Sequence, residues 1–180
     1  MTTRRKPMIQ DLSARRRVSL SAAILACASV VAGSSASAIE RSGWGQYRDR
    51  EVGLTFDMPA HIFSLESAEG GRSGTVFSSS DGRAQLRVFG APNETGVSPR
   101  EYLARIAKQD AADFSYVRTA STFFVASGTR DGVITYRRCN FSRSAEKRIG
   151  CIQLNYPQRE KRAWDAAVTR MSHSLRLVER

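Results

Sequence analysis

The sequence predicts an α+β domain: a single antiparallel β-sheet of about six or more strands packed with two helices, after an N-terminal signal segment. Short runs that alternate apolar and polar residues predict the strands. Asp81-Gly82 and Asp131-Gly132 lie between such runs, and this dipeptide is typical of β-hairpins. Two longer segments have the period of a helix, so the order is strands, helix, strands, helix.

The first 38 residues have the composition of a signal peptide. A basic stretch precedes an apolar run from Val18 to Gly33, and Ala36-Ser37-Ala38 matches the small-residue rule for cleavage. We therefore expect cleavage after Ala38 and a single domain over residues 39–180. The protein would be periplasmic or secreted in a bacterium.

Two other fates of this segment stay open. Val18–Gly33 could remain as a membrane anchor, although it is shorter than the roughly 20 apolar residues of a spanning helix. Ile24-Leu25-Ala26-Cys27 resembles a bacterial lipobox, which would retain a lipid on Cys27. Arg15-Arg16-Arg17 is a partial twin-arginine pattern, so the export route is also open.

Composition and turn residues predict nine extended segments in the domain. They are 44–47, 52–58, 61–65, 75–79, 84–89, 116–120, 122–127, 133–141 and 149–156. The segment Thr122–Ser127 is apolar on both faces, so we expect it inside the sheet with cover on both sides.

Two helices are expected. The first begins at Ser98-Pro99-Arg100-Glu101, where Ser98 and Glu101 form a capping box, and it frays near Ala111. The second runs from about Gln158 to Leu177, with Trp164 on its buried side.

Cys139 and Cys151 are predicted to form a disulfide across a hairpin. A hairpin centred on Ala145 pairs them directly, and it pairs Phe141 with Ile149 on the same face. In an exported protein such a pair is a structural staple. The spacing is not the Cys-x-x-Cys of a redox motif, and two cysteines without nearby histidines do not make a zinc site.

The positive charge of the domain is concentrated at its end. Residues 137–180 carry 11 Lys and Arg against 4 Asp and Glu, a net charge of +7. In an exported protein the anionic partners to consider are an acidic protein, a cell-wall polymer or lipid headgroups, and no nucleic acid is expected. A solvated basic face with no partner is the alternative.

The candidate binding surface is the outer face of the last helix, with two further arginines beside it. On the helix it consists of Arg159, Arg162, Arg170, His173 and Arg176, joined by Arg137 and Arg143.

No catalytic motif is recognisable, and we expect no cofactor and no metal. The sequence contains no His-Glu-x-x-His, Walker loop or Gly-x-Ser-x-Gly. A non-catalytic accessory or binding protein is the favoured interpretation. The alternative is a small periplasmic hydrolase with a site near His61, where a histidine close to Asp57 could act as an acid or base.

Four stretches of the domain carry a family resemblance. They are Tyr47 with Gly53–Pro59 (GLTFDMP), Phe124–Gly128 (FVASG), Asn155-Tyr156-Pro157, and Ser174-Leu175-Arg176 at the end of the last helix. This pattern resembles a group of small exported proteobacterial proteins of unassigned function, and its opening resembles PsbP-like domains. The resemblance implies an antiparallel sheet between helices. It implies no catalytic residue, metal or photosystem role.

Overall fold

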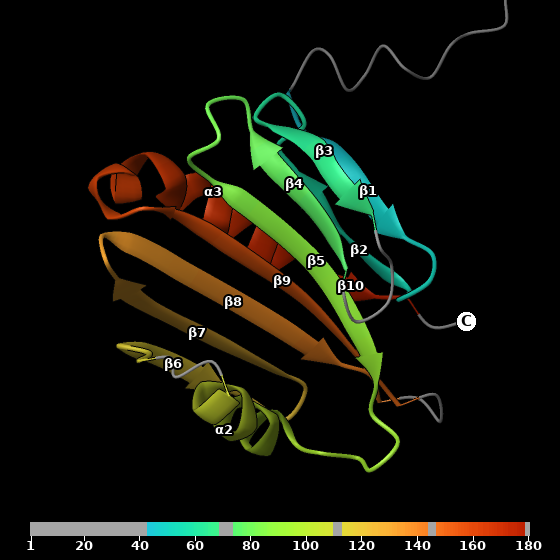
Figure 1. Cartoon of the computed structure of the whole chain (residues 1–180). Coiled ribbons are helices and arrows are strands. Elements are labelled where there is room, and N and C mark those ends of the chain that lie inside the picture. Colours follow the sequence, from blue (N-terminus) through green and yellow to red (C-terminus); the bar gives the residue numbers. More distant parts are fainter. Residues whose placement is uncertain (1–42, 69–73, 110–112, 144–146, 179–180) are drawn as a thin grey trace, which may run out of the picture. The chain divides into compact units, whose positions relative to one another are not determined.

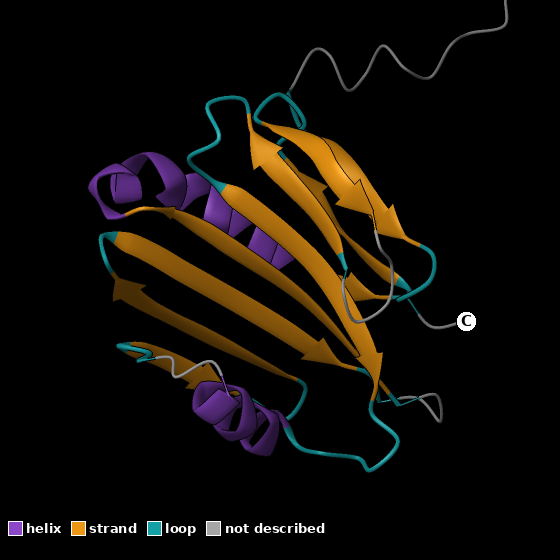
Figure 2. Cartoon of the chain, in the orientation of Figure 1, coloured by secondary structure: helices purple, strands orange, loops and turns teal. Residues whose placement is uncertain are grey.

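A seven-stranded antiparallel sheet is the frame on which the other elements pack (Figures 1 and 2). The computed structural model describes residues 43–68, 74–109, 113–143 and 147–178. Within them the strand order is β3-β4-β5-β9-β8-β7-β6. These strands are β3 (Phe63–Ala68), β4 (Thr75–Ser79), β5 (Gln85–Pro92), β6 (Tyr116–Thr119), β7 (Phe123–Arg130), β8 (Val133–Phe141) and β9 (Arg148–Pro157).

A smaller three-stranded sheet is formed by β1 (Gly45–Asp49), β2 (Leu54–Met58) and β10 (Arg176–Leu177), with β2 in the middle. The predicted strands 44–47 and 52–58 belong to this sheet, whereas the sequence had suggested one sheet for all strands. The third strand, β10, comes from the other end of the domain and pairs with β2 in antiparallel register.

The two helices cover opposite faces of the large sheet. One face, which we call the α3 face, packs against α3 (Lys161–Ser174) and the small sheet. A 3-10 turn, η1 (Gln158–Glu160), leads into α3. The other face, which we call the α2 face, packs against α2 (Pro99–Gln109) over part of its area. On one face β7 packs against α2 through Phe124 and Ala126. On the other face its residue Phe123 is half-buried beside the guanidinium groups of Arg118 and Arg138, so among the described residues the expected cover by another element is found on the α2 face only.

Apolar packing explains where the small sheet and α3 sit. Gly90 and Gly150 pair with each other across β5 and β9. A Cβ added at Gly90 would lie 2.1 Å from Val52, and one added at Gly150 would lie 2.6 Å from Leu54. The two glycines therefore open the α3 face for the small sheet. Farther along this face, Trp164 of α3 packs on Phe63 and Tyr156.

The predicted hairpin is confirmed in its register. Cys139 pairs with Cys151, and Phe141 pairs with Ile149, in the ladder between β8 and β9. The two cysteines form a disulfide. It is fully buried on the α2 face, beneath the buried α2 side chains Leu103 and Ile106.

The last helix is shorter than predicted. Ser174 ends α3, because its hydroxyl donates to the Arg170 carbonyl at 2.8 Å and accepts the Asp57 N–H at 2.8 Å. Leu175 then adopts an extended backbone, and the chain continues into β10. Arg176 therefore lies on a strand and not on the helix.

The α+β class, with a large antiparallel sheet and two helices, is confirmed. The predicted signal segment 1–38, its cleavage point after Ala38, the alternative anchor Val18–Gly33 and Cys27 all lie outside the described residues. Among the residues that are described, no helix has the length and apolarity needed to cross a membrane.

Candidate functional site

The predicted basic face of the last helix is exposed, but part of its charge is neutralised by neighbouring carboxylates. Arg159, Arg162, Arg170 and His173 are all exposed. Arg170 Nε lies 3.0 Å from the Asp57 carboxylate, and its guanidinium lies 4.3 Å from the centre of the Trp44 ring. Arg159 Nε lies 3.8 Å from the Glu160 carboxylate.

Arg176, the last residue of the predicted surface, belongs to a different group of side chains. It lines a hollow of about 240 Å³ together with Arg138 and Arg143. Phe123 and Thr122, at the start of β7, line the same hollow. Three arginines thus converge at one end of the large sheet, beside β10.

Arg118 completes this group, which we call the arginine cluster: Arg118, Arg138, Arg143 and Arg176. Phe123, which lines the hollow, lies beside the guanidinium groups of two cluster members. The guanidinium of Arg138 lies 4.5 Å from the ring centre and that of Arg118 lies 5.8 Å from it. Both distances allow cation–π attraction, which holds the guanidinium groups close to the protein surface.

Hydrogen bonds orient three of the four side chains. Arg138 donates to Asn140 Oδ1 and to Ser172 Oγ, both at 3.1 Å. Arg176 Nη1 donates to the His173 carbonyl at 2.6 Å and to the Leu175 carbonyl at 2.8 Å. Arg143 Nη2 donates to Ser121 Oγ at 3.4 Å. These partners are neutral, so they hold the guanidinium groups without cancelling their charge.

The electrostatics of the cluster favour an anion. In the described parts of the chain, none of its four arginines forms an ion pair with a carboxylate. Partial burial lowers the pKa of Arg138 below its ordinary value, and the charges of Arg176 and Arg118 lower it further. An anion in the hollow would relieve this repulsion, and guanidinium groups bind carboxylate and phosphate through paired N–H donors.

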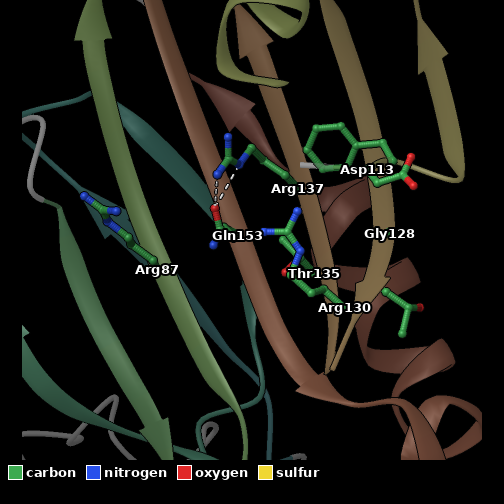
Figure 3. A pocket seen from close by; sticks show the side chains of 9 residues that line it. Arg87, Asp113, Gly128, Arg130, Thr135, Arg137 and Gln153 are labelled. Carbon is green, nitrogen blue, oxygen red and sulfur yellow. Dashed lines mark hydrogen bonds between the residues drawn. The ribbon is translucent and has the colours of Figure 1, made fainter. Parts of the chain in front are cut away.

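A second basic hollow lies on the α2 face, where α2 does not cover the sheet (Figure 3). It has a volume of about 310 Å³ and includes Arg87, Arg130, Arg137 and Asp113 in its lining. Figure 3 shows Arg137 reaching toward Gln153, and its Nε donates to Gln153 Oε1 at 2.8 Å. Arg87, Arg130 and Arg137 each take part in further interactions within the protein, so they are less available to a ligand.

The structure separates Arg137 from the residues with which the sequence analysis grouped it. Successive residues of a strand point to opposite faces, so Arg137 lies on the α2 face and Arg138 on the α3 face. Arg137 therefore cannot join Arg143 and Arg176 in one contact surface.

His61 and Asp57 do not form the acid–base pair that the alternative prediction considered. The exposed His61 ring uses Nδ1 to donate to the Gly43 carbonyl, and the Asp57 carboxylate accepts a hydrogen bond from Arg170. Among the described residues, no hydrogen bond joins His61 to a carboxylate or hydroxyl group. The same residues contain no cluster of three or more His, Cys, Asp or Glu side chains that could hold a metal ion.

Sequence reasoning missed Arg118, Arg138 and Phe123. The predicted register of the hairpin could have placed Arg138, because a disulfide at Cys139 on one face of the sheet puts the neighbouring Arg138 on the other face. The pairing of β6 with β7, which brings Arg118 beside Val125 and close to Phe123, could not be derived from the local pattern.

The chain matches no protein-family model, and the search of curated proteins finds no match. Solved structures do match. Cyanobacterial PsbP (CyanoP) from Synechocystis sp. PCC 6803 superposes with a TM-score of 0.54 at 10% identity, over 74% of this chain and 92% of that chain. A protein from Bacteroides thetaiotaomicron superposes with a TM-score of 0.44 at 11% identity, over 74% and 48%. The chain shares the PsbP-like fold.

Proposed function

We propose that the protein is an exported, non-catalytic binding protein that holds an anionic partner in the arginine cluster. The observation that carries this proposal is the convergence of four arginines that have no carboxylate partner among the described residues. Export is supported by the composition of residues 1–38 and by the buried disulfide, since disulfides persist in oxidising compartments.

The cluster also suits binding better than the helix face does. Arg170 and Arg159 already have carboxylate neighbours, whereas Arg118 and Arg176 have none among the described residues. The hydrogen bonds that orient Arg138 and Arg176 are formed before a partner arrives, so fewer side chains need to be ordered on binding.

The test compares charge reversals that change the net charge equally at two places. Binding of the disulfide-bonded protein is measured against fluorescent oligoglutamate, polyphosphate and phosphatidylglycerol vesicles, at several salt concentrations. We expect salt-sensitive binding to at least one of these probes. Arg118→Glu and Arg176→Glu should each weaken it about tenfold or more, because each removes a charge-assisted contact.

Arg162→Glu on the exposed face of α3 is the matched control and should weaken binding much less. Equal losses for Arg162→Glu and Arg118→Glu would overturn the assignment to the cluster. Binding that ignores salt concentration, or no binding to any probe, would overturn the proposed function itself.

A further inference from the structure

β6 is an edge strand whose outer side has no neighbouring strand in the described part of the chain. All four of its residues are exposed. Tyr116 is 53% exposed and Val117 is 49% exposed, so large apolar side chains lie along an edge whose outer backbone groups have no strand partner among the described residues. Such an edge is a template for the addition of another strand.

The two sides of β6 have different chemistry because alternate residues point to opposite faces. Val117 pairs with Ala126 of β7 and lies on the α2 face. Arg118 pairs with Val125 and lies on the α3 face, where it reaches the Phe123 ring.

On the α2 face, β6 borders a mainly apolar groove. The groove lies between α2 and β6 and has a volume of about 480 Å³. Most of its lining is apolar, and Arg100 and Thr119 complete it. The apolar side chains are those of Leu103, Ala104, Ala107, Phe114 and Val117. Val117 is therefore an exposed side chain that extends the apolar surface formed by the α2 side chains.

On the α3 face, β6 borders the arginine cluster. Arg118 is the cluster member that belongs to β6, and it lies close enough to Arg138 for its charge to lower the pKa of that side chain. A strand added along β6 would thus point one set of side chains toward positive charge and the other set toward the apolar groove.

We propose that β6 binds an extended segment of a partner protein in which acidic and apolar residues alternate. Backbone groups of this segment pair with the free edge of β6. Its acidic side chains meet the arginine cluster, and its apolar side chains enter the groove beside α2. This inference rests on the proposed function and names the kind of anionic partner.

Charge selects this occupant over a second copy of the chain. A second β6 would bring a second Arg118 to an edge that is already positively charged, and like charges across a strand pair are destabilising. A lipid surface offers anionic groups, but it offers no backbone that could pair with the edge.

The experiment uses blocked, fluorescent peptides of about eight residues, long enough to span β6. One is an alternating Asp-Val repeat, and the second has the same composition with all Asp residues before all Val residues. A third is the alternating peptide with every second amide N-methylated, which removes hydrogen-bond donors. We expect the alternating peptide to bind about tenfold more tightly than either of the others, and β6 amides to gain protection from hydrogen exchange.

Two valines give a variant and its matched control at unchanged net charge. Val117→Asn should weaken binding of the alternating peptide several-fold and leave the affinity of the second peptide, in which the Asp and Val residues form two blocks, unchanged. Val133 is also an exposed strand valine, at 42% exposure, but it lies at the β7–β8 turn. Val133→Asn should change neither affinity.

The inference and the proposed function can fail separately. Equal binding of the alternating and block peptides, with no change in β6 amide exchange, would overturn strand addition while leaving an anion-binding cluster. If vesicle binding depends on Arg118 and the alternating peptide does not bind, the acidic segment is ruled out, and the anionic partner of the cluster is a lipid headgroup. If no anionic probe binds, both the inference and the proposed function are wrong.

Discussion

The Asp81 side chain organises the turn between β4 and β5. One carboxylate oxygen accepts hydrogen bonds from Ser79 Oγ at 2.6 Å and from the Arg83 N–H at 3.0 Å. The buried Ser79 hydroxyl in turn accepts the Ala84 N–H at 2.9 Å. The Asp-Gly dipeptide was enough to predict this hairpin. The role of Ser79 was not predictable, because it depends on how the finished turn folds back on the strand.

These contacts predict how Asp81 responds to acid. The hydrogen bond from Ser79, followed by those from Arg83, lowers the pKa of Asp81 from 3.8 to about 2. Because the folded pKa lies below the unfolded one, the stabilisation is present above about pH 4 and is lost as the pH falls toward 2. Carbon-detected NMR titration of the Asp81 carboxyl should give this midpoint.

Ser79→Ala removes the hydrogen bond that contributes most to the lowered pKa of Asp81 and should raise this pKa toward its ordinary value. A native midpoint near 3.8 would show that the turn does not hold the carboxylate as described.

The hairpin of β8 and β9 was the element that could be predicted most completely. Its register followed from two alternating strands and one pair of cysteines, because a shift by one residue would have turned Cys139 and Cys151 to opposite faces. The end of α3 was predicted wrongly. The helical period continues through Leu175, but the contact of Ser174 with Asp57, which is far away in sequence, ends the helix.

The disulfide is expected to stabilise the domain by about 3 kcal/mol, because it closes a loop between residues that are 12 apart and so lowers the conformational entropy of the unfolded chain. Urea unfolding of the oxidised protein should therefore shift to lower denaturant on reduction. The double variant Cys139→Ala/Cys151→Ala should unfold at a lower urea concentration than the oxidised protein, and reductant should not change its midpoint. An oxidised protein whose midpoint is the same with and without reductant would contradict this role.

At the scale of the whole molecule, the arginine cluster marks the limit of sequence reasoning. Its members come from β6, β8, the segment after β8, and β10. The excess of positive charge after residue 137 was visible in the sequence. On the helical face to which it was assigned, however, the carboxylates of Asp57 and Glu160 neutralise part of this charge. Only the pairing of β10 with β2 brings Arg176 beside Arg138 and Arg143.

Export can be checked by the intact mass of the native protein from the cell envelope. We expect a chain that begins at Ile39 and takes up two alkyl groups only after reduction. A full-length chain would favour the anchor Val18–Gly33, and a lipid adduct would favour Cys27. Alkylation before reduction would mean that Cys139 and Cys151 are free in the cell.

The position of β10 has a consequence for biogenesis. β2 lies near the start of the domain, and one of its two partner strands, β10 (Arg176–Leu177), follows all the other described strands in the sequence. Neither the small sheet nor the packing of Trp164 of α3 on the large sheet can be completed while the ribosome still holds these residues. The nascent domain therefore cannot complete this part of its core until Arg176–Leu177 has left the ribosome. For the exported protein that we propose, this order delays folding until β10 is available, which would suit an export route that carries unfolded chains.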